Sequence, residues 1–420
     1  MKVLWFTGRI RKQNRTFYGG GGWIRALAAE LAKCSDLELA MSYFCDEAIE
    51  PFDSKGVQQY PMCLKARGFI KKIVDNIGRK PEYCDEYLLQ HMYSVINEYK
   101  PDIIQIFGTE SMFTPLIGKT SIPTILYLQG MINPIANAFF PYGMNTYTLK
   151  FWRVDKREWI YNNGRIAREK QLKQMANNEL LIYKKTKYMI GRTKFDYQVS
   201  RLFSPESKYF KVNEMMREPF YEGLLWERPL HYKYTIISTL SNVTYKGLDV
   251  IFKTASILSN KGIEYVWKIA GISINCDIVK LMQHLTKINI QSINIDFLGI
   301  LGEEDLKKEL LSANVMVHPS YIDNSPNSIG EAQLLGLPVI ACYVGGVPDF
   351  IQNGETGELI PTNDPYDLAF ILVKDINNPF LHMYSKPAYD VAIKRHNKSS
   401  IIGDLLSAYN EVLTDNCCDA

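Results

Sequence analysis

The sequence predicts an α/β fold with two doubly wound domains that face a central cleft. Apolar strand-like runs alternate with helical patterns through both halves of the chain, which is typical of parallel sheets covered by helices. The 420 residues exceed one ordinary core and suit two domains of about 200 residues each. We expect an N-terminal domain over 1–224, a second domain over 225–385, and a C-terminal helix over 386–420 that crosses back to the first domain.

The predicted elements follow the apolar pattern in chain order. In the first half, strands are expected at residues 3–6, 37–44, 103–107, 124–128 and 188–190. In the second half, strands are expected at 234–238, 265–270, 295–298, 314–317 and 339–343, with helices at 247–258, 303–311 and 326–335. The irregular, proline-marked segment 217–229 suits a linker between the domains, and a last helix is expected over 389–412.

Composition excludes several classes of protein. The formal net charge is only +3, which argues against nucleic acid as the main ligand. No apolar run approaches the roughly 20 residues of a membrane-spanning helix. The apolar run at residues 3–6 is too short for a signal peptide. The eight cysteines show no Cys-x-x-Cys pair, so we expect a cytoplasmic protein.

The segment 321–340 is the most informative in the chain, because it places Asp323 and Glu331 on either side of a predicted helix start. Ser325 suits the N-cap position and Pro326 the first helical turn, while Gly336 suits the helix end. The free N–H groups of such a helix start attract a diphosphate. Two solvated acids in an ordinary αβ unit would give the same pattern, so both interpretations stay open.

Two glycine-containing loops also follow predicted strands. Residues 19–22 are four consecutive glycines that lead into a helix, and glycine lets backbone N–H groups approach a ligand closely. Their spacing is neither that of an ATPase nor that of a dinucleotide enzyme, and a merely flexible loop is the alternative. Lys246 precedes Gly247 at another helix start, where its ammonium group suits a bound diphosphate; a solvated lysine is the alternative.

Together these segments resemble the GT4 group of retaining glycosyltransferases, most specifically over residues 234–360. The matching positions are Lys246, Gly247, Pro326, Asn327, Glu331, Ala332, Gly336, Pro338, Val339 and the run 345–348. The resemblance implies a GT-B fold of two Rossmann-like domains. It also implies transfer of a sugar from a nucleoside-diphosphate sugar to a glycan or lipid-linked glycan, with retained anomeric configuration, in the synthesis of a surface polysaccharide.

The resemblance assigns residues to three groups. The catalytic group is Lys246, Asp323 and Glu331, with Asp323 on the donor sugar and Glu331 on the ribose. The implied donor-binding residues are Gly20, Gly21, Gly22, Gly299, Asn324, Ser325, Pro326, Asn327, Ser328 and Glu331. The implied acceptor-side residues are Gln129, Glu110 and Arg192.

Three positions depart from the family pattern. Asp323 is one methylene shorter than the usual Glu, Thr239 replaces an arginine of the usual cationic clamp, and Gln129 replaces a histidine. Arg192 is a candidate to compensate for the lost arginine. The departures motivate one alternative, a nucleotide-sugar-binding subunit with impaired catalysis. A nucleotide-sugar epimerase of the same architecture is the other alternative.

No Asp-x-Asp motif occurs, so we expect no metal and no cofactor besides the nucleotide-sugar co-substrate. Residues 64–80 and 151–161 mix basic with apolar or aromatic residues, a pattern that suits a helix on anionic lipid. Ordinary amphipathic helices packed on a sheet give the same pattern. The partners expected are thus a nucleotide-sugar donor, a glycan or lipid-linked acceptor and peripheral contact with the inner face of the membrane, but not nucleic acid.

Overall fold

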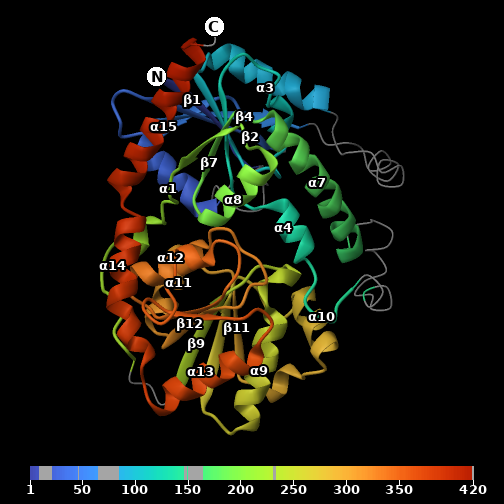
Figure 1. Ribbon diagram of the computed structural model, residues 1–420, viewed down its shortest axis with the longest axis vertical. Helices are drawn as coiled ribbons and strands as arrows, with labels where there is room; N and C mark the ends of the chain where they lie inside the picture. Colours follow the sequence, from blue (N-terminus) through green and yellow to red (C-terminus); the bar gives the residue numbers. More distant parts are fainter. Residues whose placement is uncertain are drawn as a thin grey trace. The chain divides into compact units, whose positions relative to one another are not determined.

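The computed structural model describes residues 1–8, 21–45, 47–64, 85–145, 149, 164–229 and 233–418 (Figure 1). Gly20 and most of the two basic segments, 65–80 and 151–161, lie outside these residues. The chain forms two compact units: unit 1 is Met1–Asn133, Asp155–Met215 and Asn397–Ala420, and unit 2 is Pro134–Val154 and Met216–His396. The chain thus enters unit 2 first at Pro134 and again at Met216, and it returns to unit 1 at Asn397, whereas the predicted boundaries lie at 225 and 386.

Within the described residues, unit 1 holds one eight-stranded sheet. Its spatial order is β3 (Phe52–Ser54), β4 (Val57–Cys63), β2 (Glu38–Cys45), β1 (Lys2–Phe6), β5 (Ile103–Phe107), β6 (Thr124–Tyr127), β7 (Tyr188–Gly191) and β8 (Lys208–Lys211). All neighbours are parallel except β3 and β4. The sequence did not predict β3, β4 and β8. In β4 the reason is clear, because Gln58, Gln59 and Pro61 hide the apolar pattern.

The helices in the same part of the chain cover this sheet (Figure 1). They are α1 (Gly21–Leu31), α3 (Asp85–Tyr99), α7 (Arg165–Lys185) and α8 (Lys194–Phe203). The short α4 (Ile132–Asn137) begins in unit 1 and continues into unit 2 at Pro134. A capping box starts α8, since Thr193 Oγ1 accepts from the N–H of Asp196, whose carboxylate accepts from the N–H of Thr193. Such local signals fix where a helix begins.

The C-terminal helix is two helices, α14 (Ser385–Arg395) and α15 (Lys398–Cys418), rather than the single helix expected over 389–412. The helix α15 belongs to unit 1 and contacts α1 (Figure 1). Its Tyr409 is fully buried, accepts a hydrogen bond from Trp5 Nε1 at 2.9 Å and donates one to Gln105 Oε1 at 2.8 Å. The end of the chain is therefore anchored to the central strands β1 and β5.

Unit 2 contains a six-stranded, fully parallel sheet in its described part. The spatial order is β11 (Ile295–Gly299), β10 (Tyr265–Ala270), β9 (Tyr234–Thr239), β12 (Val315–His318), β13 (Val339–Cys342) and β14 (Glu358–Ile360). The connecting helices are α9 (Leu248–Asn260), α10 (Asp277–Thr286), α11 (Glu303–Leu311), α12 (Asn327–Leu334) and α13 (Pro365–Asn377). All five predicted strands are present, and only the short β14 was missed.

The segment expected to form a linker packs into unit 2 instead. Trp226 is buried there, where its backbone N–H donates to Leu335 O and its indole N–H to Ala313 O, both at 2.7 Å. Because this side chain is fixed by the core of unit 2, the segment 217–229 follows that unit. No helix among the described residues is long and apolar enough to cross a membrane.

Candidate functional site

The strand order of unit 2 reverses between β9 and β12. The connections from β9 lead outward through β10 to β11, whereas β12 starts the opposite half of the sheet. In open α/β sheets, ligands bind beyond the carboxyl ends of the strands at such a switch point. The loops that leave β9 and β12 carry Lys246 and Asp323, so the topology brings together two residues 77 positions apart in the sequence.

Lys246 and Asp323 form an ion pair at this switch point. Lys246 Nζ lies 2.5 Å from Asp323 Oδ2, and both side chains are largely but not fully buried. Lys246 ends a short 3-10 turn, Thr244–Lys246, which is tied down by a hydrogen bond from Thr244 Oγ1 to Phe139 O. The structure thus brings the lysine and the first acid together, which their sequence separation alone did not show.

His318, which the sequence analysis missed, completes this cluster. It is the last residue of β12, and its Nε2 lies 3.1 Å from Asp323 Oδ2. Its Nδ1 lies 3.5 Å from Ser328 Oγ in the first turn of α12. A neutral imidazole that donates from Nε2 therefore links the acid to the helix start. The available signal was the position of His318 at a strand end, directly before Pro319.

The electrostatics of the cluster keep Asp323 ionised. Burial opposes its charged form, but the Lys246 ammonium and the hydrogen bond from His318 outweigh burial and hold the pKa of Asp323 well below its usual range. Burial lowers the pKa of His318, although Asp323 acts in the opposite direction. The cluster at neutral pH is therefore a lysine cation, a carboxylate and a neutral histidine.

The lowered pKa of His318 predicts a pH effect on stability. Between the lowered pKa of the folded form and the ordinary histidine pKa of about 6.5, the unfolded chain binds the proton more readily, so acidification destabilises the folded protein. We expect His318→Asn to lose less thermal stability than the wild type between about pH 7.5 and about pH 5.5.

Melting temperatures across this range measure the effect, with the exposed His382→Asn as the control. His91, whose pKa burial also lowers, contributes part of the remaining acid sensitivity. An equal acid-induced loss in the wild type and in His318→Asn would contradict this prediction.

Two glycines let the loops of the site approach one another. Gly247 has φ +77° and Gly345 has φ +48°, the left-handed region that favours glycine. A Cβ on Gly247 would lie 2.0 Å from Pro319 O, and one on Gly345 would lie 2.0 Å from Asp323 O. The N–H of Gly346 also donates to Asp323 O at 3.0 Å. The backbone around Asp323 is therefore held by a contact that only glycine permits.

Gly345→Ala should displace the Asp323 backbone. Backbone strain alone costs about 1–3 kcal/mol of stability, and we expect this variant to lose more than that. Gly354→Ala is the matched control, because Gly354 has φ +76° but no atom within 4 Å of the added Cβ. The free energies of unfolding of the two variants measure the difference. Equal losses would show that close packing against Asp323 contributes nothing.

Glu331 is paired with Arg217, which the sequence analysis placed in the linker and did not assign to the site. Arg217 Nε and Nη2 donate to the two carboxylate oxygens of Glu331 at 2.6 and 2.7 Å, 114 residues away in sequence. Burial raises the pKa of Glu331, whereas the Arg217 hydrogen bonds and charge lower it. Each carboxylate oxygen has a second lone pair, so Glu331 can accept from a ligand hydroxyl while Arg217 holds it.

The start of α12 differs by one residue from the prediction. Pro326, not Ser325, occupies the N-cap position, and no side chain caps the helix, which begins at Asn327. The free N–H groups of this turn thus remain open to a ligand. Asn327 Oδ1 is buried and makes no hydrogen bond in the described structure, while Asn324 is buried and Ser325 is partly exposed. Gly336 has φ +80° after the helix end, as predicted.

The remaining predicted donor residues lie at strand or helix ends. Gly299 ends β11 with φ +71°, next to a register shift between Ile269 and Ala270 of β10. Gly21 and Gly22 are the first two residues of α1 in unit 1, rather than loop residues. Thr239 ends β9, at the position where the family pattern has an arginine.

The predicted acceptor-side residues all belong to unit 1. Arg192 is buried, donates from Nη2 to Gln129 O at 3.2 Å and stacks on Trp23 with its guanidinium 4.8 Å from the ring centroid. Loss of hydration among the surrounding protein atoms raises the pKa of Glu110. The charge of Glu179 raises it further, and that of Arg192 lowers it. Because the Glu110 residue is exposed, water screens these effects and makes the shift smaller. Gln129 and Arg192 are thus in contact.

Glu179 was missed by the sequence analysis, although it organises this part of unit 1. It is fully buried on α7 and accepts hydrogen bonds from Thr109 Oγ1 at 2.6 Å and from the N–H groups of Ile132 and Asn133 at 2.9 and 2.8 Å. It thereby fixes the chain that follows β6 and Gln129. A single glutamate in a charged helix gave no signal of this role.

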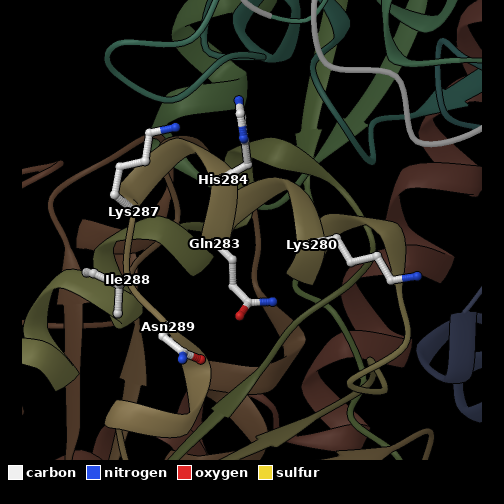
Figure 2. Close-up of a pocket in the computed structure, with 6 residues that line it drawn as sticks. All are labelled: Lys280, Gln283, His284, Lys287, Ile288 and Asn289. Carbon is white, nitrogen blue, oxygen red and sulfur yellow. The ribbon is translucent and has the colours of Figure 1, made fainter.

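A shallow depression of about 460 Å³ lies apart from the site, around the end of α10 (Figure 2). Its lining residues are Lys280, Gln283, His284, Lys287, Ile288 and Asn289. In Figure 2 the side chain of Lys280 extends away from the other labelled residues, whereas that of Lys287 extends on the side of His284. They do not converge on one ligand, and none of the predicted site residues lines this depression.

Two doubly wound units, with charged loops at the switch point of unit 2, define a protein of the GT-B fold. Solved structures with this fold cover nearly the whole chain. Sucrose-phosphate synthase from Thermosynechococcus elongatus aligns over 99% of both chains with a TM-score of 0.70 and 13% identity. Anabaena HepE in complex with UDP aligns over 98% of this chain and 100% of its own, with a TM-score of 0.63 and 14% identity.

The sequence relationship is more specific but covers less of the chain. Residues 233–378 match the family of glycosyl transferases group 1, so unit 2 carries a domain of that family. D-inositol 3-phosphate glycosyltransferase of Streptomyces coelicolor is 36% identical over 99 residues, which are 24% of this chain and 21% of that protein. The corresponding protein of Mycolicibacterium vanbaalenii is 30% identical over 122 residues, 29% of this chain and 27% of its own. The matches thus span only about a quarter of these relatives.

Proposed function

We propose that this protein transfers a sugar from a nucleoside-diphosphate sugar to a glycan or lipid-linked glycan acceptor, with retention of anomeric configuration. The observation that carries the proposal is the Lys246–Asp323 pair at the switch point of unit 2, beside an uncapped helix start. A cation and free N–H groups together suit a diphosphate. The match to glycosyl transferases group 1 covers this same part of the chain.

In the proposed reaction, the bond between the sugar C1 and the diphosphate oxygen breaks, and a bond from the acceptor oxygen to C1 forms on the same face. The acceptor proton passes to an oxygen of the departing diphosphate. Lys246 stabilises the negative charge that develops on the leaving group. Asp323 holds hydroxyls of the donor sugar, and Glu331 accepts from the ribose while Arg217 fixes its orientation. This chemistry requires neither a protein nucleophile nor a metal ion.

Uridine diphosphate is the first nucleotide to test, because solved structures of the similarly folded HepE contain UDP and UDP-glucose. In a thermal-shift titration with UDP, GDP, ADP and CMP, a ligand that binds the folded state raises the melting temperature. We expect one nucleoside diphosphate to stabilise the protein selectively. No shift at millimolar concentration with any of the four would contradict a donor site in unit 2.

A transfer assay then separates the proposed enzyme from the alternatives. The wild-type protein with the matching nucleotide sugar should form a glycosidic product whose anomeric configuration, read by NMR, equals that of the donor. Conversion of the donor to its epimer without an acceptor would indicate an epimerase. Binding without transfer or slow donor hydrolysis would indicate a binding subunit.

For a lipid-linked acceptor, we place the reaction at the cytoplasmic face of a membrane. This placement is supported by the basic and aromatic composition of residues 64–80 and 151–161, which suits contact with anionic lipid. Flotation of the purified protein with anionic vesicles at low salt tests this placement. The absence of co-migration would favour a glycan that is not attached to a membrane.

A further inference from the structure

Tyr321 lies between β12 and Asp323, outside the residues assigned above to the candidate site. Its hydroxyl donates to Asp249 Oδ2 at 2.8 Å and lies 3.0 Å from Asn363 Oδ1. Its backbone N–H donates to Tyr245 O at 2.8 Å. Asp249 is in the first turn of α9, two residues after Gly247, and is fully buried.

These contacts join the two loops of the site a second time. Tyr245 precedes Lys246, and Tyr321 precedes Asp323 by two residues, so the backbone hydrogen bond lies next to the ion pair. The two loops are thus joined by the Lys246–Asp323 ion pair at 2.5 Å and by the adjacent backbone hydrogen bond from Tyr321 to Tyr245. The hydrogen bond from the Tyr321 hydroxyl to Asp249 connects both loops to α9. A shift of Tyr321 would therefore change the distance between the ammonium and carboxylate groups.

We propose that Tyr321 and Asp249 are positioning residues that hold Lys246 and Asp323 in the geometry required for sugar transfer. The role rests on the function proposed above, and it acts through the two loops rather than through contact with the substrate. Positional errors of about 1 Å at reacting groups can slow an enzyme by about 100-fold, so fixing this geometry matters for rate.

The chemistry of Asp249 supports a role beyond packing. Its Oδ2 also accepts from Lys253 Nζ at 3.1 Å, but Oδ1 is buried and makes no hydrogen bond in the described structure. An unpaired oxygen on a buried carboxylate is costly and calls for an explanation. Burial and the charge of Asp249 raise the pKa of Tyr321 far above its usual value, so the hydroxyl remains a donor.

Unit 2 offers a matched control for this contact. Tyr234 at the start of β9 donates from its hydroxyl to the buried Asp375 at 2.6 Å. Both Tyr321→Phe and Tyr234→Phe remove one tyrosine–carboxylate hydrogen bond. Tyr234 lies at the amino end of β9, however, whereas Lys246 and Asp323 lie beyond the carboxyl ends of β9 and β12.

The test compares kcat, donor KM and hydrogen exchange in wild type, Tyr321→Phe and Tyr234→Phe. We expect Tyr321→Phe to lower kcat by about 10-fold or more with little change in nucleoside-diphosphate affinity, while Tyr234→Phe keeps the wild-type kcat. Exchange at the amides of residues 320–325 should quicken in Tyr321→Phe alone; Pro319 and Pro326, which flank this segment, carry no N–H. Asp249→Asn, which keeps an acceptor for Tyr321, should retain more activity than Asp249→Ala.

Equal kcat values in the two tyrosine variants, or equal exchange at residues 320–325, would overturn the positioning role. The exchange measurement needs no substrate, so it also decides the question if the proposed function is wrong. If the proposed function is wrong, the wild-type protein itself will neither bind a nucleotide nor transfer a sugar. The two failures are therefore distinguishable.

Discussion

Replacing Lys246 by Met should lower the rate of sugar transfer by about 10²- to 10³-fold, the usual scale for removing one group that stabilises developing charge. Among the described residues, the Lys246 ammonium group is the cation that contacts Asp323, since the other contacting side chain, His318, is neutral at neutral pH. Without it the departing diphosphate loses a counter-charge, and the pKa of Asp323 loses its largest lowering influence. Steady-state kinetics with the matching nucleotide sugar measure the effect.

Lys268→Met is the control for this variant. Lys268 Nζ pairs with Glu309 Oε2 at 2.6 Å in the same unit, and both side chains are partly exposed. Its loss removes a lysine and an ion pair without touching the switch point. Transfer by Lys246→Met at the rate of Lys268→Met would show that Lys246 has no part in the chemistry.

Glu331→Gln should weaken nucleotide binding by about 1–3 kcal/mol, because a hydrogen bond between the ribose and a charged acceptor is lost. It should also lower the free energy of unfolding by about 3 kcal/mol, since removing one partner leaves the other charge of a buried pair uncompensated. In Glu331→Gln an amide NH₂ replaces one of the two oxygens that face the Arg217 fork at 2.6 and 2.7 Å. Calorimetric titration and denaturant unfolding measure the two effects separately.

Glu309→Gln provides the comparison for stability. Its ion pair with Lys268 is partly exposed, and such pairs contribute only about 0–1 kcal/mol. Unchanged nucleotide affinity in Glu331→Gln, together with reduced stability, would assign Glu331 a purely structural role. Unchanged stability would mean that Arg217 finds another partner when the carboxylate is lost.

The alternation of apolar runs was enough to predict the parallel sheets, because a strand buried on both faces must be apolar along its length. Helix ends were predicted less accurately. Ser325 had the usual chemistry of an N-cap, yet the backbone places Pro326 at that position. Strands such as β4 were missed, since its glutamines and proline do not follow the apolar pattern.

The sequence by itself determined the fold class and the identity of Lys246, Asp323 and Glu331 as candidates, because these signals are local: a short run of residues around a strand end and a helix start. Only the tertiary structure decided their partners. Arg217 and Tyr321 are defined by contacts that span 114 and 72 residues of chain, and no local pattern records which strands become neighbours. His318 is only five residues from Asp323, but their contact depends on the fold of the loop after β12. The physical reason is that an ion pair or hydrogen bond depends on distances in space, which the order of β9 and β12 sets.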